Sequence, residues 1–208
     1  MDRVKRKSSK VIGYWMSEKK SQKLNWTDFA SVCREHGYSL IKINLDMPLE
    51  EQGPFTVILH KLTVIIASAI QGNAKAQATI DAVEHYIRRH PEMAVIDPLE
   101  NVRKLLDRYV SYRVVHDSKL EEIDVFIPMS VELTSDDPEV NLEKIVSAGI
   151  GFPFVCKPSV GHGTSDCHKM TIIFNEKGVV DCKPPCVAQA FVNHNAILYK
   201  IYVLGEDF

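Results

Sequence analysis

Residues 152–168 read Phe-Pro-Phe-Val-Cys-Lys-Pro-Ser-Val-Gly-His-Gly-Thr-Ser-Asp-Cys-His, and this stretch is the most informative part of the chain. Its apolar start predicts a short strand that ends at Lys157, followed by a glycine-rich loop that carries His162 and His168. Glycines let backbone N–H groups approach phosphate oxygens, and a lysine ammonium supplies compact positive charge. The stretch therefore predicts a site for a nucleoside triphosphate, although a β-hairpin whose loop merely needs glycines fits the same residues.

Composition limits the classes of protein to which the chain can belong. Its 208 residues, 45% of them hydrophobic, suffice for a globular protein of one or two domains. A net charge of −2 creates no global field that would attract nucleic acid or a membrane surface. No apolar run reaches the length of about 18 residues that a membrane crossing needs, and no signal peptide is evident. We therefore expect a cytoplasmic monomer with no nucleic-acid and no membrane partner.

The five cysteines are an odd number and include no Cys-x-x-Cys pair. This pattern predicts free, buried thiols in a reducing compartment. A zinc site made of Cys182, Cys186 and His194 is an alternative, but two prolines separate the thiols and the spacing offers no fourth ligand.

In the first half of the chain, predicted strands alternate with predicted helices. Apolar stretches at 11–15, 39–44, 55–59 and 94–96 predict the strands. Helical spacing of apolar residues predicts the helices, one of which is capped by Asn25. This alternation predicts a small parallel sheet in a domain over residues 10–107, preceded by a disordered basic N-terminus at residues 1–9.

Cations follow two of these predicted strands. Lys20 comes shortly after the first strand, and Lys61 comes shortly after the third. Ligands of parallel sheets bind beyond the carboxyl ends of the strands, so both lysines are expected at one rim. Lysines are also common on surface loops, and that simpler interpretation stays open.

The second half is richer in predicted strands. A helix is expected over residues 99–109, and a second one over residues 139–148 begins after the capping pair Asp137 and Pro138. The stretches 153–157, 169–174, 186–192 and 196–204 predict strands of an antiparallel sheet. Lys200 would share a face of the last strand with apolar residues, which suits a face that borders a polar ligand or a sheet edge.

Separate segments of the chain resemble a single family. They include Gly13-Tyr-Trp-Met-Ser-Glu-Lys-Lys20, Pro184-Pro-Cys-Val-Ala-Gln189 and further matches at residues 51–54, 60–63, 97–99, 105–108, 152–157, 162–164 and 193–200. On these segments the chain resembles the inositol-tetrakisphosphate 1-kinase family, also called the inositol 1,3,4-trisphosphate 5/6-kinase family. The resemblance covers nearly everything after residue 10.

The resemblance implies an α/β fold with two domains. Residues 10–107 would bind inositol phosphate, and residues 108–208 would form the central part of an ATP-grasp domain, an antiparallel sheet with helices. The family transfers a phosphoryl group from its co-substrate ATP, with Mg²⁺, to inositol 1,3,4-trisphosphate at position 5 or 6 and to inositol 3,4,5,6-tetrakisphosphate at position 1.

The resemblance also implies roles for individual residues. Substrate would be bound by Lys20, Lys61, His168 and Lys200. ATP would be bound by Arg108, Lys157, Gln189, Ala190, Phe191, Val192 and Lys200. His162 and Lys200 would act in catalysis.

The chain departs from the family pattern in three places. The loop that ends at His168 is one residue longer than expected, Val64 replaces an acidic residue, and the sequence stops at Phe208, before the family's Mg²⁺ ligands. No metal ligand is therefore predicted in this chain, which we expect to be a C-terminally truncated fragment or short isoform without full activity. The alternatives are a non-catalytic module that binds inositol phosphate or a protein, and, with less support, an ATP-grasp ligase.

Overall fold

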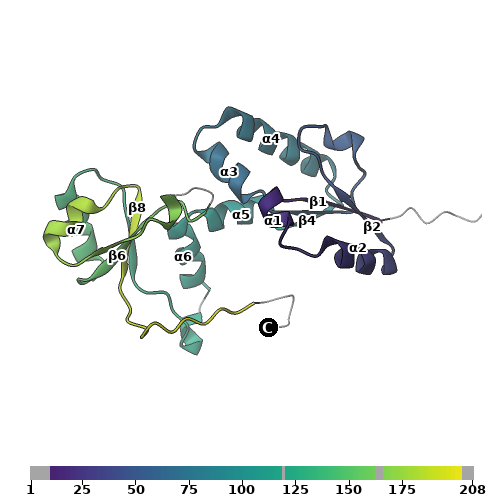
Figure 1. Ribbon diagram of the computed structural model, residues 1–208. Helices are drawn as coiled ribbons and strands as arrows, with labels where there is room; N and C mark the ends of the chain where they lie inside the picture. Colours follow the sequence, from purple (N-terminus) through teal and green to yellow (C-terminus); the bar gives the residue numbers. More distant parts are fainter. Residues whose placement is uncertain (1–9, 119, 163–165, 203–208) are drawn as a thin grey trace, which may run out of the picture. The chain divides into compact units, whose positions relative to one another are not determined.

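The computed structural model describes residues 10–118, 120–162 and 166–202. The chain divides between Asp107 and Arg108 into two compact units, and residues 160–162 belong to the first unit. Each unit has its own sheet and its own hydrophobic core (Figure 1). Within the described part of the chain, no helix combines the length and apolar character that a membrane crossing requires.

The first unit contains a parallel sheet with the strand order β2-β1-β3-β4. Right-handed helical crossovers join parallel strands, so all four carboxyl ends lie at the same edge. The strands are β1 (Lys10–Trp15), β2 (Tyr38–Lys42), β3 (Val57–His60) and β4 (Ala94–Ile96).

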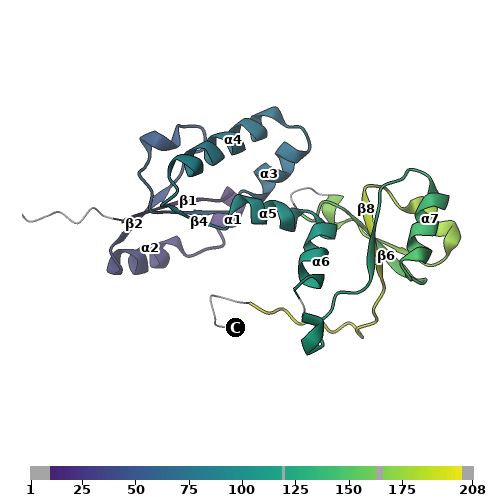
Figure 2. The same ribbon diagram turned by 180° about the vertical axis from the view of Figure 1, so that it is seen from behind.

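Helices cover both faces of this sheet. Helix α2 lies on one face, whereas α3 and α4 lie on the other in both views (Figures 1 and 2). Asn25 caps α2 as predicted, because its side chain accepts a hydrogen bond from the Asp28 N–H at 3.2 Å. The helices are α1 (Glu18–Ser21), α2 (Trp26–Glu35), α3 (Thr63–Ile70), α4 (Ala74–Arg89) and α5 (Leu99–Leu106), with a 3₁₀ turn η1 (Leu49–Glu51).

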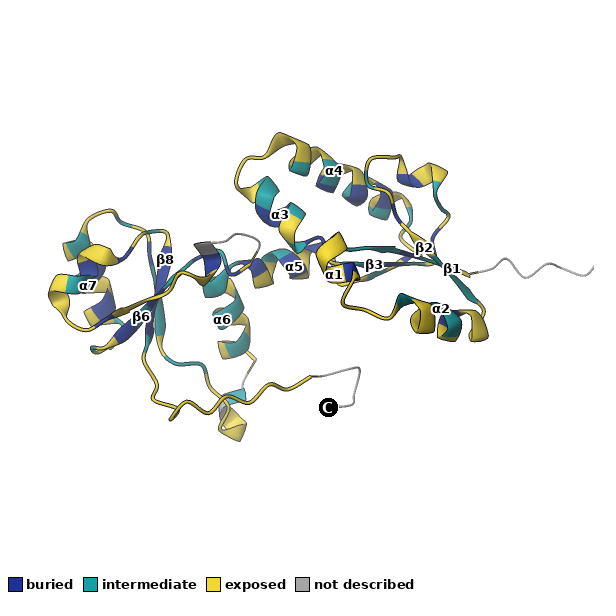
Figure 3. Cartoon of the chain, viewed as in Figure 1, coloured by how far each residue is buried: buried dark blue, intermediate teal, exposed yellow. Residues whose placement is uncertain are grey.

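The first core lies between the sheet and the α3–α4 pair, where the buried side of α4 faces the strands (Figure 3). Its largest fully buried side chains include Ile58, Leu62, Ile66, Ile80 and Tyr86. Gly13, in the middle of β1, leaves the space that this packing needs, since a Cβ atom there would lie 2.7 Å from the Phe55 ring and 2.9 Å from the Ile43 side chain.

The second unit contains an antiparallel sheet with the strand order β5-β8-β6-β7. Together with the parallel sheet of the first unit, it confirms the predicted fold class. The strands are β5 (Ser130–Leu133), β6 (Phe154–Pro158), β7 (Thr171–Ile173) and β8 (Cys186–Ala190).

Helices α7 (Pro138–Ser147) and α6 (Arg108–His116) lie on opposite sides of this sheet in both views (Figures 1 and 2). The second core includes Leu133, Ile145, Phe154, Ile173 and Val179, the last of which belongs to the 3₁₀ turn η4 (Glu176–Asp181). Further 3₁₀ turns are η2 (Leu120–Ile123) and η3 (Asp166–His168). Asp137 caps α7 through its side chain, with Pro138 at the first helical position, as predicted.

The prediction of one continuous helix over residues 99–109 is wrong. Helix α5 ends at Leu106, Asp107 is extended, and α6 starts at Arg108. The backbone near the break pairs with residues 159–161: the Gly161 N–H donates to the Leu106 carbonyl at 2.7 Å, and the Arg108 N–H donates to the Ser159 carbonyl at 2.8 Å. Hydrogen bonds to a distant segment thus replace those that would continue the helix.

The strand predicted over residues 196–204 is also wrong for its described part, residues 196–202, which form no strand. Its apolar side chains are solvated, with Leu198 77% and Tyr199 88% exposed (Figure 3). A strand needs a neighbouring backbone for its hydrogen bonds, and the described residues place none beside this segment. Residues 203 and 204 lie outside the described part.

The close approach at Gly13 yields a stability prediction. Gly13→Ala should lower the free energy of unfolding by roughly 1–3 kcal/mol, because the added methyl group overpacks a filled core. Gly151→Ala is the matched control, since a Cβ there meets nothing within 4 Å. Thermal unfolding followed by circular dichroism compares the two variants, and equal midpoints would contradict the prediction.

Candidate functional site

The carboxyl ends of β1 and β3 are neighbours in the first unit. Trp15 pairs with His60, and the Lys61 N–H donates to the Trp15 carbonyl at 2.8 Å. Helix α1 starts three residues after β1 ends, and the Lys20 N–H donates to the Ser17 carbonyl at 2.9 Å. Lys20 and Lys61 therefore follow adjacent strands at one rim of the sheet.

The side chains of both lysines are exposed, and neither makes a hydrogen bond or ion pair among the residues the structure describes. Two other lysines near the strand ends differ from them, because the Lys42 Nζ lies 3.0 Å from a Glu18 carboxylate oxygen and the Lys75 Nζ lies 3.5 Å from an Asp46 carboxylate oxygen. Lys20 and Lys61 thus carry uncompensated positive charge that is available to an anion.

A hollow of ≈ 490 Å³ opens at the carboxyl ends of β1 and β2 and is lined by both of the ion-paired lysines, Lys42 and Lys75. An anion in this hollow would have to compete with the two carboxylates for their ammonium groups. The hollow alone is therefore a weaker anion site than the rim formed by Lys20 and Lys61.

His60 holds the ends of β3 and β4 together. Its Nε2 lies 2.8 Å from the Asp97 carbonyl oxygen, and its Nδ1 accepts a hydrogen bond from the Leu62 N–H at 3.3 Å. This pair of bonds requires a neutral imidazole with its proton on Nε2. Burial lowers the pKa of His60 below its ordinary value, since partial removal from water disfavours the charged ring.

In the second unit, Lys157 points away from the core. Residues directly opposite each other on antiparallel strands share a face, so Lys157 lies in a row with Val187 and Glu132. The Lys157 Nζ donates to the Gln189 Oε1 at 2.5 Å and to the Tyr112 hydroxyl at 3.3 Å. These two contacts fix the ammonium group on the sheet face that carries α6.

Arg108 organises the backbone that follows Lys157. Its Nε donates to the Pro158 carbonyl at 2.9 Å, and its Nη2 donates to the Cys167 carbonyl at 2.7 Å. The guanidinium thereby joins the end of β6 to the turn η3. Three residues of the predicted ATP set, Arg108, Lys157 and Gln189, therefore lie in one hydrogen-bonded region of the second unit.

The remaining predicted site residues differ in their placement. Ala190 ends β8, and Phe191 and Val192 follow it in an exposed segment. Lys200 is exposed in the segment that lacks the predicted strand, and His168 is exposed at the end of η3. His162 is exposed and belongs to the first unit, and residues 163–165 of its loop lie outside the described part.

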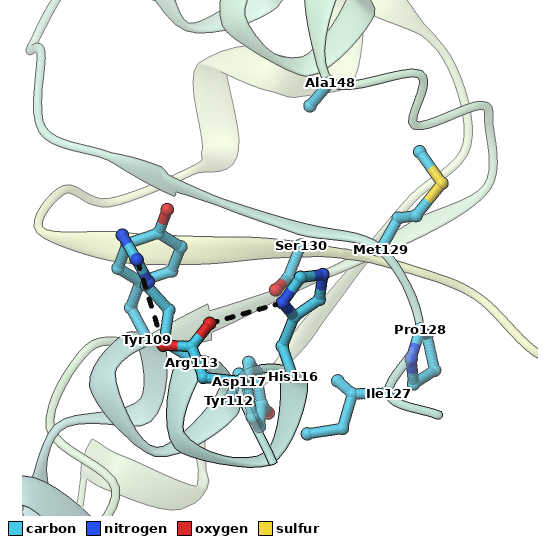
Figure 4. Close-up of a pocket in the computed structure, with 10 residues that line it drawn as sticks. All are labelled: Tyr109, Tyr112, Arg113, His116, Asp117, Ile127, Pro128, Met129, Ser130 and Ala148. Atoms are coloured by element: carbon cyan, nitrogen blue, oxygen red, sulfur yellow. Dashed lines mark hydrogen bonds and ion pairs between the residues drawn. The ribbon is translucent and has the colours of Figure 1, made fainter. Parts of the chain in front are cut away.

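The sequence interpretation missed a pocket of ≈ 380 Å³ beside α6 and β5 (Figure 4). Tyr109, Tyr112, Arg113 and His116 line it from the helix, and they follow the i, i+3, i+4, i+7 spacing of one helical face. That spacing was the available signal. A helical stripe of aliphatic residues predicts a buried face, whereas this stripe is aromatic and basic and therefore does not.

All five cysteines are free and buried, as predicted. Cys156, Cys182 and Cys186 belong to the second core, and hydrogen bonds from the Cys182 and Cys186 thiols lower the pKa of Cys156. His194 is exposed, and within the described residues no group of three or more His, Cys, Asp or Glu side chains is arranged to hold a metal ion. The zinc alternative therefore has no support.

Comparison with known families agrees with the sequence resemblance. A family model described as the inositol 1,3,4-trisphosphate 5/6-kinase pre-ATP-grasp domain matches residues 11–102. The model of the ATP-grasp domain from the same family matches residues 119–208.

Curated relatives include two proteins named inositol-tetrakisphosphate 1-kinase. The one from Danio rerio is 45% identical over 201 residues, and the one from Xenopus laevis is 43% identical over 201 residues. Each alignment covers 96% of this chain and 50% of the relative. The chain thus spans about half the length of these relatives.

Among solved structures, the D-cycloserine synthetase DcsG superposes with a TM-score of 0.55 at 15% identity, over 88% of this chain and 59% of that one. A carboxyaminoimidazole ribonucleotide synthase from Aspergillus clavatus complexed with ATP gives a TM-score of 0.50 at 10% identity, over 88% and 47% of the two chains. At such identities the likeness shows the fold alone.

The lowered pKa of His60 predicts how stability depends on pH. As the pH falls below the ordinary value of 6.5, the unfolded chain takes up a proton before the folded chain does, so the free energy of unfolding should fall. His60→Gln should reduce this fall as the pH drops from about 7 through the unfolded pKa of about 6.5.

Urea unfolding can measure this effect, because both tryptophans of the chain, Trp15 and Trp26, lie in the first unit and report on it by fluorescence. His85→Gln, a change at an exposed position of α4, serves as the control. An unchanged pH dependence in His60→Gln would show that the imidazole is not the responsible group.

Proposed function

The chain belongs to the inositol 1,3,4-trisphosphate 5/6-kinase family. On this premise we propose that it functions in the ATP-dependent phosphorylation of inositol polyphosphates. The reaction moves the γ-phosphoryl group of ATP to a ring hydroxyl. The substrates proposed are inositol 1,3,4-trisphosphate, phosphorylated at position 5 or 6, and inositol 3,4,5,6-tetrakisphosphate, phosphorylated at position 1.

The observation that carries the proposal is the pair of uncompensated cations at the rim of the first sheet. Lys20 and Lys61 follow adjacent parallel strands, where ligands of such sheets bind. An inositol polyphosphate presents phosphates on several sides of a small ring, so it can meet two separate ammonium groups at once. A hydrogen bond between charged groups contributes about 1.5–3 kcal/mol, which makes two such contacts significant.

The network around Lys157 supports the ATP half of the proposal. An ammonium group has three N–H donors, and the contacts to Gln189 and Tyr112 use two of them. The third donor is left for a phosphate oxygen of ATP. Arg108 acts by positioning, because its two carbonyl contacts fix the backbone between β6 and η3. The backbone from Gln189 to Val192 would meet the adenine ring.

We assign His162 and His168 as hydrogen-bond donors to phosphate groups, and Lys200 as a cation that contacts both ATP and substrate. Phosphoryl transfer depends more on positioning and on neutralising charge than on a covalent nucleophile. Each of these groups could serve one of these needs. These contacts would form only with the bound substrates, and the family pattern supports the assignment.

Mg²⁺ belongs to the proposed reaction by family, but the described residues do not form a site for it. We therefore assign no Mg²⁺ ligand to this chain. The oligomeric state proposed is a monomer.

A second function, a module that binds inositol phosphate without catalysis, has one observation in its favour. The rim lysines belong to a unit with its own sheet and core, so binding there does not require the second unit to hold ATP. The likeness to two synthetases rests on identities of 10% and 15%, and it gives no support for a ligase beyond the fold.

Calorimetry with an inositol tetrakisphosphate tests the rim. Lys20→Ala and Lys61→Ala should each weaken binding about tenfold, which corresponds to ~1.4 kcal/mol, because each removes a cation that contacts phosphate. Lys19→Ala is the matched control, since Lys19 is also exposed and is the neighbour of Lys20 on α1. If the unmodified chain and both variants bound the inositol tetrakisphosphate with equal affinity, neither lysine would be a ligand of its phosphates.

ATP binding tests the second unit independently. Lys157→Met should weaken ATP binding at least about tenfold, or ~1.4 kcal/mol, whereas Lys177→Met, at an exposed position of η4, should leave it unchanged. Circular dichroism checks that both variants fold. Loss of ATP binding in Lys157→Met with intact inositol phosphate binding would separate the two sites, and undiminished ATP binding would contradict the role of Lys157.

A further inference from the structure

Strand β5 forms an outer edge of the second sheet and leaves part of its backbone without partners. The Ala190 N–H donates to the Met129 carbonyl at 2.8 Å, which sets the alternation of the ladder between β5 and β8. Val131 and Leu133 consequently bond to β8, whereas the N–H and C=O groups of Ser130 and Glu132 point away from it. Among the described residues, no hydrogen bond engages these outward groups.

Two hollows follow this free edge. The pocket of ≈ 380 Å³ next to α6 is lined by Ser130, and a second hollow of ≈ 610 Å³ is lined by Glu132 together with Tyr109 of α6 and residues of α7, so it extends around the edge of the strand. Both are also lined by Tyr109 and Ala148, so they adjoin along the strand. Figure 4 shows the first hollow between α6 on one side and Met129 and Ala148 on the other.

The first hollow suits a large apolar side chain. Tyr109, Tyr112 and Met129 contribute rings and a thioether to its lining. Its charged groups already have partners, because the Asp117 carboxylate lies 4.0 Å from the Arg113 guanidinium and 3.5 Å from the His116 Nδ1. An aromatic ring can therefore enter this hollow without leaving a charge newly unpaired.

The second hollow suits a cation. Glu132 and Glu143 both line it, and neither carboxylate forms an ion pair within the described part of the chain. Lys144 also lines the hollow, and its Nζ donates to the Thr134 hydroxyl at 3.3 Å. The two carboxylates give this end of the edge a negative excess over the single lysine.

We propose that the free edge of β5 binds an extended peptide, which adds to the sheet as a further antiparallel strand. Ser130 and Glu132 would each exchange two backbone hydrogen bonds with the peptide residue directly opposite. The antiparallel direction places a basic residue opposite Glu132 and, two residues later in the peptide, an aromatic residue opposite Ser130. The preferred sequence is therefore Lys-x-Phe or a close variant of it.

A second copy of this chain fits the edge less well. Pairing β5 with another β5 about a two-fold axis would bring Glu132 and Glu143 of both copies to one short interface. Like charges across a strand pair destabilise it. A peptide with a basic residue would be attracted to these carboxylates, whereas a second copy of the chain would add two more carboxylates and increase the repulsion.

The probe is a fluorescein-labelled peptide, Thr-Lys-Thr-Phe-Thr amide, titrated with the 208-residue chain and followed by fluorescence anisotropy. N-methylation of the Lys and Phe amides should weaken binding at least about tenfold, because it removes the two N–H groups that face β5. N-methylation of the central Thr should have little effect, since its N–H points away. The reversed peptide, Thr-Phe-Thr-Lys-Thr, should bind at least about fivefold more weakly.

Variants of the chain test the same pairing from the other side. Ser130→Pro, which removes an outward N–H and no ladder bond, should weaken binding at least about tenfold. Glu132→Lys should weaken binding about threefold to tenfold, and a peptide with Glu in place of Lys should recover it. Glu176→Lys, an exposed change on η4, is the matched control.

Circular dichroism confirms that each variant is folded, and the N-methylated peptides keep the test decisive if Ser130→Pro does not fold. Equal binding of the doubly N-methylated and unmodified peptides would overturn the proposal, as would equal binding of the reversed peptide. Concentration-dependent dimers of the chain that disappear in Ser130→Pro would show that a second copy occupies the edge and would also overturn it.

Discussion

A lysine on the face of a sheet must keep its ammonium group in contact with polar atoms, and this constraint organises the second unit. The Lys157 ammonium makes these polar contacts with the Gln189 amide oxygen and the Tyr112 hydroxyl. Its position is therefore fixed without a bound ligand. Arg108 extends the same region to the backbone after β6. The opposite face of the sheet is free to form an apolar core, because all of these polar contacts lie on one side.

In the first unit, the side chains of Lys20 and Lys61 have no hydrogen-bond or ion-pair partner among the described residues. Lys20 and Lys61 lie at one rim because they follow adjacent parallel strands, whose carboxyl ends lie at the same edge of the sheet. Neighbouring Lys42 and Lys75 are neutralised by carboxylates, and this contrast distinguishes the rim from ordinary surface charge. His60 ties β3 to the residue after β4 without adding charge, since its imidazole is neutral.

Local signals in the sequence predicted much of the fold. The caps at Asn25 and Asp137 depend on adjacent residues, and both predictions are confirmed. The errors arise where distant segments decide the outcome: residues 159–161 interrupt the helix predicted over 99–109, and no neighbouring backbone supports a strand over residues 196–202. The contact between Tyr112 and Lys157 also joins distant segments and was not predicted, whereas the family motifs led to the prediction that Lys157 and Gln189 bind ATP, which stays a prediction.

Lysine acetylation mapped by mass spectrometry, with and without each ligand, tests the central claim that the two units hold different phosphorylated molecules. An inositol tetrakisphosphate should protect Lys20 and Lys61, ATP should protect Lys157, and Lys19 and Lys177 should react equally in every sample. Protection of the rim lysines by ATP alone, or unchanged reactivity of all five, would contradict it.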